Sequence, residues 1–447
     1  MRMKKTTAER ILSFARDYKA LDAEAFLRSY TATTIEIKDQ KVDAFDRAQD
    51  IGAGLRVIVN GRMGFAFTTD LSERALEVLA RAAVTNAESA AADPFHSIPE
   101  RLSSAYQAVS IFDPEIPRVT EKEKIERVMA LERAAYAVDS RIKRIRKAAA
   151  SFSSSETLIM NSQGALSAYQ GTAASSSIEV VAEEGSESQA GSDFDVNRFY
   201  RKLEVEEVGR RAAHRALDLL GAKSINSTKA PMVLAALVAE EFLAIMASGF
   251  SAENVQKKKS LFMGRLGAEI VAPVITVYDD GLLEHGLGTA PSDDEAVPTR
   301  KKTIIDKGRL SMFLYNTYAA NKDKTVSTGN GLRGGFKGVP GVGVTNLYVE
   351  PGTSSLENLI CTMGKGLYVT EVMGMHTANP ISGDFSVGAT GFWIENGKRV
   401  YPVREITIAG NIIDLMKNVE AVGSDLRFAG RIGCPSLRVK EISIGGK

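Results

Sequence analysis

Apolar side chains recur at spacings of three and four residues in several stretches of the chain, which is the pattern of an amphipathic helix. In residues 6–19 the apolar positions on this spacing are Ile11, Leu12, Phe14, Ala15 and Tyr18. Further helices are expected over residues 72–91, 120–138, 204–220 and 231–250. Thr120 followed by Glu123 matches a capping box, so one of these helices should begin at Thr120.

Alternation of apolar and polar positions predicts antiparallel strands in residues 23–70. The pair Asn60-Gly61 lies between two strand-like runs and predicts a type I′ hairpin turn. More strand-like sequence flanks a turn at residues 161–164. Beyond residue 250, strands separated by turn residues are expected over 274–278, 302–315, 341–349, 366–373, 385–395, 403–408 and 436–444.

Glycine is unevenly distributed, with 11 of the 38 glycines in residues 1–250 and the other 27 after them. Helical and strand-like sequence is therefore segregated along the chain, which predicts an α+β fold. We expect an N-terminal antiparallel sheet with helices, a middle α/β segment and a large antiparallel, β-rich, barrel-like C-terminal domain. The expected boundaries are an N-terminal α+β domain at 1–92, a linker at 93–119, a middle α+β domain at 120–228 and the C-terminal domain at 229–447.

The composition argues against several classes of function and of binding site. A formal net charge of +1 over 447 residues gives no electrostatic reason to expect nucleic acid or an acidic membrane as a partner. Cys361 and Cys434 are the two cysteines, too few for a disulfide framework, so a reducing cytoplasm is expected. No secretory signal or membrane-spanning run is recognisable. The four histidines are far apart in sequence, which excludes a helix-borne pair of histidine zinc ligands.

Two motifs suggest chemistry but have simpler interpretations. Residues 329–334 spell GxGxxG, yet neither an apolar strand before nor a helix after them is expected, so a flexible glycine-rich crossing between strands is favoured over a dinucleotide loop. Such glycines would also allow close approach of an extended peptide. Ser382, His376 and Asp384 contain the residue types of a catalytic triad, but no nucleophile elbow accompanies them, and a structured turn is favoured.

The C-terminal third carries a longer and more specific pattern. Residues 374–428, GMHTANPISGDFSVGATGFWIENGKRVYPVREITIAGNIIDLMKNVEAVGSDLRF, closely resemble the TldD/PmbA family and, within it, the PmbA (TldE) branch. Residues 36–71, EIKDQKVDAFDRAQDIGAGLRVIVNGRMGFAFTTDL, resemble the first domain of that family, and residues 435–447, PSLRVKEISIGGK, its last strand. The resemblance covers essentially the whole chain in the same order.

The resemblance implies a cytoplasmic metallopeptidase system in which TldD-type and PmbA-type subunits form a dimer around a chamber. The TldD-type subunit binds zinc through a His-Glu-x-x-x-His helix and a distal cysteine, and it hydrolyses extended or unfolded peptides and peptide precursors. Zinc lowers the pKa of a bound water to about 7, and the glutamate acts as the general base.

This chain departs from that catalytic pattern. The register of the family motif places Leu243, Ala244 and Ser248 where histidine, glutamate and histidine stand in the TldD-type subunit. Cys434 falls at a different position from the distal cysteine, so no metal role is carried over to it. We therefore expect no catalytic residue, metal or cofactor in this chain, and zinc in a TldD-type partner.

The expected function is that of a non-zinc PmbA/TldE-type subunit that completes a chamber, as a heterodimer with a TldD-type subunit or as a homodimer. Two classes remain as alternatives: a regulatory binding protein in line with the family's label as modulator of DNA gyrase, and a homodimeric peptidase whose metal site uses scattered ligands such as His285 or His376. The candidate peptide-facing or interface residues are Asn330, Gly331, Arg333, His376, Asn379 and Asp384.

Overall fold

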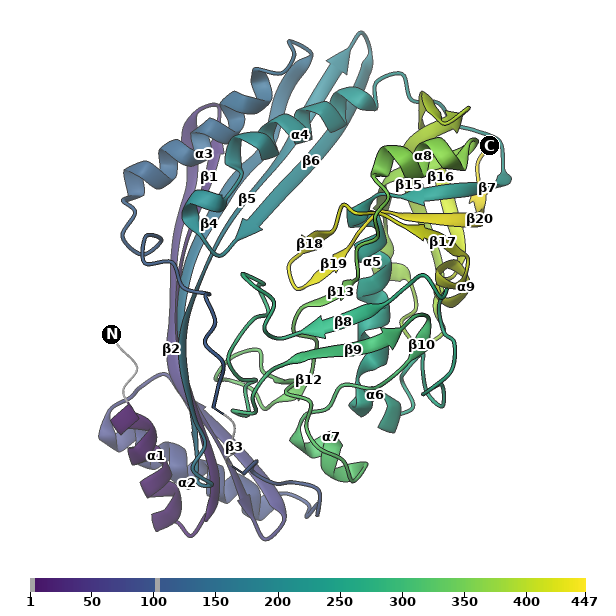
Figure 1. Ribbon diagram of the computed structural model, residues 1–447. Coiled ribbons are helices and arrows are strands. Elements are labelled where there is room, and N and C mark those ends of the chain that lie inside the picture. The colour runs from purple at the N-terminus through teal and green to yellow at the C-terminus, as the bar shows by residue number, and fades with distance from the viewer. Residues whose placement is uncertain (1–4, 101–104) are drawn as a thin grey trace.

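The computed structural model describes residues 5–100 and 105–447. A six-stranded antiparallel sheet with the order β3-β2-β1-β4-β5-β6 forms the N-terminal part. Its long strands curve down one side of the molecule (Figure 1). The strands are β1 (Asp22–Lys38), β2 (Lys41–Val59), β3 (Arg62–Thr68), β4 (Ile142–Asn161), β5 (Leu166–Glu184) and β6 (Glu187–Asn197).

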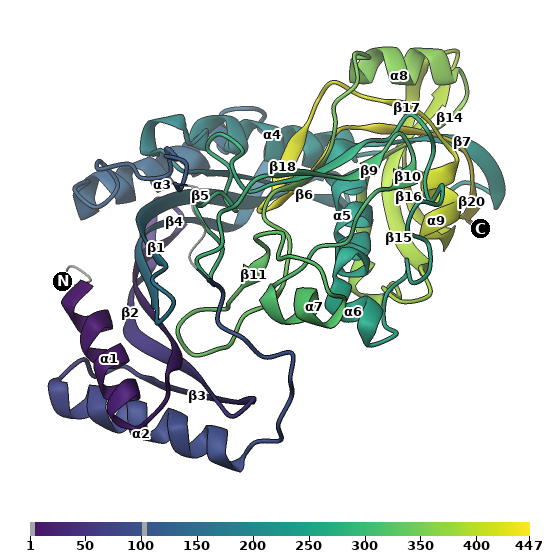
Figure 2. The ribbon, with the colours of Figure 1, turned by 60° about the horizontal axis from the view of Figure 1, so that its bottom comes forward.

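Two pairs of helices cover the two ends of this sheet, as Figure 2 shows. Helices α1 (Lys5–Asp17) and α2 (Glu73–Ser89) share one apolar core with the sheet, and α3 (Glu121–Tyr136) and α4 (Val205–Asp218) share another. Glycines in the strands allow the close contacts. A Cβ on Gly64 would lie 2.0 Å from the carbonyl oxygen of Ala83 in α2, and one on Gly191 would lie 2.3 Å from the backbone nitrogen of Ala216 in α4.

The C-terminal part is built around a second sheet, with the order β16-β15-β14-β7-β20-β17. Because β20 also pairs with β16, five of these strands close into a barrel. Helix α5 (Ala236–Ala247) packs against the barrel with the side chains of Phe242, Leu243 and Met246 almost completely buried. The strands are β7 (Thr228–Leu234), β14 (Gly366–Met373), β15 (Asp384–Glu395), β16 (Lys398–Asn411), β17 (Val419–Val422) and β20 (Leu437–Gly445).

Shorter elements complete the C-terminal part. A third sheet has the order β10-β9-β8-β13-β19-β18 and shares the large apolar core with α5. Its strands are β8 (Val277–Asp280), β9 (Lys301–Asp306), β10 (Arg309–Leu310), β13 (Leu347–Val349), β18 (Arg427–Ala429) and β19 (Ile432–Cys434). The remaining elements are β11 (Gly331–Leu332), β12 (Gly341–Val342), α6 (Ala252–Gln256), α7 (Thr317–Lys322), α8 (Leu356–Met363), α9 (Ile412–Lys417) and the 3-10 turns η1 (Tyr200–Lys202), η2 (Ser248–Phe250) and η3 (Met375–Thr377).

The predicted α+β class with a barrel-like C-terminal domain is confirmed. The Asn60-Gly61 hairpin is confirmed by positive φ angles of 52° and 73°, and the capping box of Thr120 and Glu123 is formed. The helix expected from residue 231 is wrong at its start, because residues 231–234 belong to β7. This strand lies between β14 and β20, so its apolar run is continuous, as in a buried helix.

The first sheet takes strands from both sides of the segment 93–119. Strand β1 pairs with β4 from Glu24 opposite Asn161 to Ile37 opposite Ala148. The described part of the segment also contacts the C-terminal part: the Tyr318 hydroxyl donates to Asp93 at 2.8 Å. The domain boundaries given above stay a prediction.

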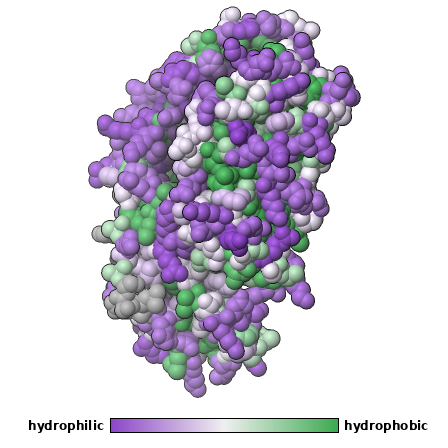
Figure 3. All heavy atoms as spheres, turned by 45° about the vertical axis from the view of Figure 1, so that its right-hand side comes forward, coloured by the Kyte–Doolittle hydropathy of each residue, from purple (hydrophilic) through white to green (hydrophobic). Residues whose placement is uncertain are grey.

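The surface mixes polar and apolar areas. Hydrophilic residues cover most of the side shown in Figure 3, and hydrophobic residues gather in a band along its centre. The loop between α6 and β8 exposes Met263, Leu266 and Val274, each to more than half. No helix in the described ranges is both long and apolar enough to cross a membrane.

Candidate functional site

Helix α5 carries the positions at which a zinc motif is expected in the resembling family. Leu243 is completely buried in the large core, and Ala244, beside it on the helix, is half-buried. Ser248 begins the turn η2 just beyond α5, and its exposed hydroxyl donates to the carbonyl oxygen of Ile245 at 3.4 Å. The first of the three positions therefore faces the core and has an apolar side chain.

The residues at these positions do not fit zinc. Leucine and alanine side chains offer no ligand atom, and the serine hydroxyl replaces an imidazole. Cys434 lies buried on β19, where burial raises the pKa of its thiol well above the ordinary value. A thiol that stays protonated is a poor metal ligand. Within residues 5–100 and 105–447, no group of three or more histidine, cysteine, aspartate or glutamate side chains is arranged to hold a metal ion.

The two histidines considered as scattered ligands have other surroundings. His285 packs edge-on against Phe199, with ring centroids 4.7 Å apart, and its Nδ1 lies 3.5 Å from Nζ of Lys202. His376 lies in the exposed turn η3. A lysine ammonium group next to an imidazole disfavours binding of a second cation there.

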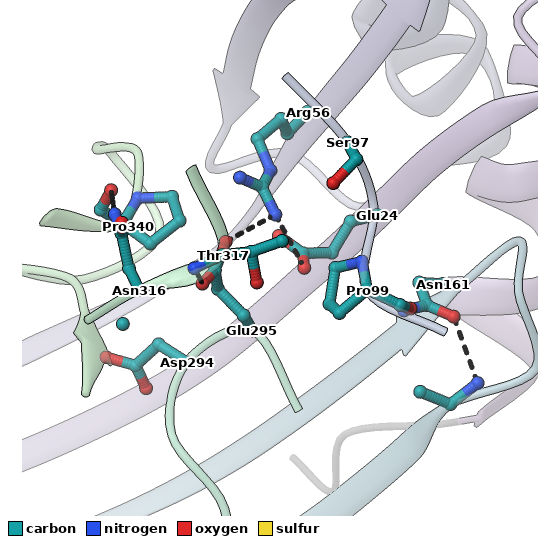
Figure 4. A network of polar contacts seen from close by, with 12 residues as sticks. Glu24, Arg56, Ser97, Pro99, Asn161, Asp294, Glu295, Asn316, Thr317 and Pro340 are labelled. Carbon is teal, nitrogen blue, oxygen red and sulfur yellow. Dashed lines mark hydrogen bonds and ion pairs between the residues drawn. The ribbon is translucent and has the colours of Figure 1, made fainter. Parts of the chain in front are cut away.

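A buried ion network joins the N-terminal sheet to the C-terminal part. Arg56 on β2 lies between two carboxylates, with its Nη2 3.1 Å from Glu24 and 3.0 Å from Glu295 (Figure 4). Arg333 forms a second ion pair with Glu24, and its guanidinium group lies over the ring of Phe26 at 5.1 Å. All four charged side chains are buried, so each depends on its partners for stabilisation.

The predicted residues Asn330, Gly331 and Arg333 all lie in or beside this network. The amide group of Asn330 accepts from Lys302 at 2.8 Å and donates to Asp279 at 2.8 Å, and the backbone N–H of Gly331 donates to Asp293 at 2.8 Å. The glycine-rich segment is thus held by buried contacts and is not the loose crossing expected for it. It connects parts of the same chain, and its role toward a peptide or partner stays a prediction.

His376, Asn379 and Asp384 form a separate, exposed turn. The side-chain oxygen of Asn379 accepts from the backbone N–H groups of Ile381 and Ser382 at 2.8 and 3.1 Å. Asp384 accepts from Asn411 at 3.0 Å and from Ser382 at 2.8 Å, and these bonds lower its pKa. No bond joins His376 to this pair in the described chain, so the turn is structured as expected but not as a triad.

A third group of residues in the structure was not among the predicted site residues. A cavity of about 460 Å³ lies between helix α4 with strand β6 and the C-terminal part of the molecule. It is lined by Glu240 and Glu241 on α5 and by Glu371 on β14. The indication was present in the sequence: two adjacent glutamates interrupt the most apolar stretch of the chain. Because burial of a carboxyl group is costly, such a pair in an apolar helix points to a specific environment.

Three family sequence profiles match the chain in order. They describe domain 1 (residues 23–87), the central domain (114–220) and the C-terminal domain (227–446) of PmbA/TldA metallopeptidases. The metalloprotease PmbA of Escherichia coli O157:H7 is 31% identical over 432 residues, which cover 96% of this chain and 93% of that protein.

Solved structures show the same fold over the full length. A Thermotoga maritima protein described as a candidate modulator of a DNA gyrase superposes with a TM-score of 0.92 at 27% identity, covering 99% of this chain and all of that one. TldE from Thermococcus kodakarensis gives a TM-score of 0.91 at 24% identity, covering 98% of this chain and all of that one. The matched ranges, the order of the domains and the fold all agree, and the chain belongs to the PmbA/TldD metallopeptidase family.

Proposed function

We propose that this chain is the PmbA/TldE-type subunit of a cytoplasmic metallopeptidase complex that acts on extended or unfolded peptides, and that a TldD-type partner supplies the zinc. The observation that carries the proposal is the chemistry of α5. The core position Leu243 and its neighbours Ala244 and Ser248 provide neither the ligands nor the general base that zinc-dependent hydrolysis needs.

The surface supports assembly with a second chain. Met263, Leu266 and Val274 are exposed on one loop, where their apolar side chains are available for contact with a partner. The turn containing His376, Asn379 and Asp384 is also exposed and rigidly bonded, and it is our second candidate for contact with a partner or peptide. Arg333 would support such a surface by joining the C-terminal part to Glu24 of the first sheet, and Asn330 and Gly331 by fixing the glycine-rich segment around it.

Co-expression with a TldD-type chain tests the proposal. We expect the two chains to copurify in equal amounts and the complex to cleave an unfolded polypeptide faster than the partner alone, in a reaction that chelators stop. This chain alone should neither bind zinc in a 1:1 ratio nor cleave the polypeptide. Leu266→Asp should weaken assembly, whereas Leu21→Asp, a control at an exposed position far along the chain, should not.

Two results would overturn the proposal. Stoichiometric zinc with chelator-sensitive cleavage by the purified chain alone would show that it is itself a peptidase. Absence of any complex with the partner, together with no gain in cleavage, would show that it is not a subunit of this system.

A further inference from the structure

The cavity lined by the three glutamates lies where the middle of the chain meets the C-terminal barrel. Residues of helix α4 and strand β6 line one side of it, and residues of α5, β14, β15, β16 and β18 line the rest. Its volume of about 460 Å³ falls within the range of small-molecule sites. Tyr368 on β14 and Phe392 on β15 contribute aromatic surface to it.

Glu240 is the unusual member of this lining. Its residue is only 6% exposed, and it has no hydrogen bond or ion pair with any residue that the structure describes. Buried polar side chains almost always have a partner, and an unpaired buried carboxylate is strongly unfavourable. Burial, followed by the charge of Glu241, accordingly raises the pKa of Glu240 to about 8.

The cations nearest to the cavity are already engaged. Arg215 on α4 is 3.2 Å from the buried Asp193 and donates to the carbonyl oxygen of Ser192 at 2.8 Å. Arg399 lies over the rings of Tyr368 and Phe392, at 5.0 Å from each. The cavity therefore has an excess of carboxyl groups that the chain itself does not neutralise.

The charge and the lining of the cavity indicate which class of ligand would bind there. The excess of carboxyl groups favours a positively charged ligand, and no described group of acidic, histidine or cysteine side chains has the arrangement of a metal site. Arg399 already covers the rings of Tyr368 and Phe392, but the apolar side chains of Leu237, Val238 and Val372 line the same cavity and favour a cation that carries an apolar stem. An alkylammonium or guanidinium group meets both requirements, whereas a hydrated metal ion meets only one.

We propose that this cavity binds an organic cation, an ammonium or guanidinium group on an apolar stem, with Glu240 as its ion-pair partner and Glu241 and Glu371 at the same wall. The cation would come from a free amine or from a basic side chain of a peptide. Only the second source rests on the function proposed above; binding of a free amine concerns the chain alone.

Binding should change the protonation of the site. At pH 7 the Glu240 carboxyl is mostly protonated, and an ammonium group would convert it to the carboxylate, so that one proton leaves for the solvent. Other titratable or charged groups on the surrounding elements are Arg215 and Asp218 on α4, Glu241 on α5, Tyr368 and Glu371 on β14, Arg399 on β16, Arg427 on β18 and Cys434 on β19.

Calorimetric titration of the full-length chain with cadaverine and with agmatine tests the proposal. We expect saturable 1:1 binding, release of a proton at pH 7 measured in buffers of different ionisation enthalpy, and no binding of the uncharged analogue 1-pentanol. Glu240→Gln should weaken binding about tenfold or more. Glu88→Gln, the same change at an exposed site on α2, should leave it unchanged.

A second variant keeps the proposal testable if Glu240→Gln fails to fold. Glu371 is exposed at the edge of the cavity, so Glu371→Gln should fold normally and still weaken binding. An unfolded peptide with a single lysine, compared with the same peptide carrying norleucine, separates the two sources of the cation. Absence of saturable binding by every probe, or unchanged affinity in a folded Glu240→Gln chain, would overturn the proposal, whatever the outcome of the co-expression experiment.

Discussion

At the residue scale, Glu240 links the cavity to the stability of the fold. Its pKa is raised from 4.5 to about 8, so the folded chain favours the protonated form. The stability contributed by that proton is complete below about pH 4 and is lost as the pH rises through 8. Glu240→Gln stays neutral, and we expect it to be more stable than the parent chain at pH 9, by an amount on the order of 3 kcal/mol.

Urea unfolding of both chains at pH 5 and pH 9 measures this difference, with Glu88→Gln as the control. The advantage of the variant should nearly disappear at pH 5. A variant that is less stable than the parent at pH 9 would mean that the folded chain stabilises the Glu240 carboxylate.

Leu243 allows a second test on α5. Its side chain is completely buried, so Leu243→His places a polar ring in the core without a partner and should lower the free energy of unfolding by about 2–5 kcal/mol. Ser248→His changes an exposed position and should cost less than about 0.5 kcal/mol. Added zinc should not raise the Tm of Leu243→His, because Ala244 and Ser248 do not supply the other residues of the zinc motif; a zinc-dependent rise would reveal a latent site.

At the element scale, the start of α3 gives a prediction with a built-in control. The Thr120 hydroxyl accepts from the backbone N–H of Glu123, and Glu123 bonds back to Thr120, whereas Ser72 at the start of α2 makes no side-chain capping bond. Thr120→Ala should therefore lower the free energy of unfolding by about 1 kcal/mol, and Ser72→Ala by much less. Equal losses in thermal unfolding would contradict the role of the cap.

Elements that depend on residues close together in the sequence were predictable, whereas elements that depend on contacts between distant parts of the chain were not. The hairpin at Asn60-Gly61 and the cap at Thr120 depend on residues a few positions apart, and both are present. Strand β7 has the continuous apolar run of a buried helix, and its two neighbours in the sheet, β14 and β20, come more than a hundred residues later. The cavity was not predictable for the same reason, since Glu240 and Glu371 are 131 positions apart and line one cavity only in the folded chain.

At the scale of the whole molecule, the buried ion network of Glu24, Arg56, Glu295 and Arg333 joins the N-terminal sheet to the C-terminal part. Arg333→Ala would leave the buried Glu24 with one cation in place of two, and we expect a loss of about 3 kcal/mol or more in the free energy of unfolding. Lys337→Ala removes an exposed pair with Asp50 and should cost less than about 1 kcal/mol. Similar losses for both variants in denaturant unfolding would show that burial of the network adds no stability.

The first sheet also determines the order in which the chain can fold during synthesis. Thr31 on β1 bonds to Ser154 on β4, 123 positions later, and at roughly 5–20 residues per second on the order of ten seconds of translation separate them. Until then the β1–β2–β3 meander emerges from the ribosome with one edge of β1 unpaired. Arg28, Ser29 and Thr31 place hydrophilic side chains along that edge, which limits its pairing with neighbouring nascent chains.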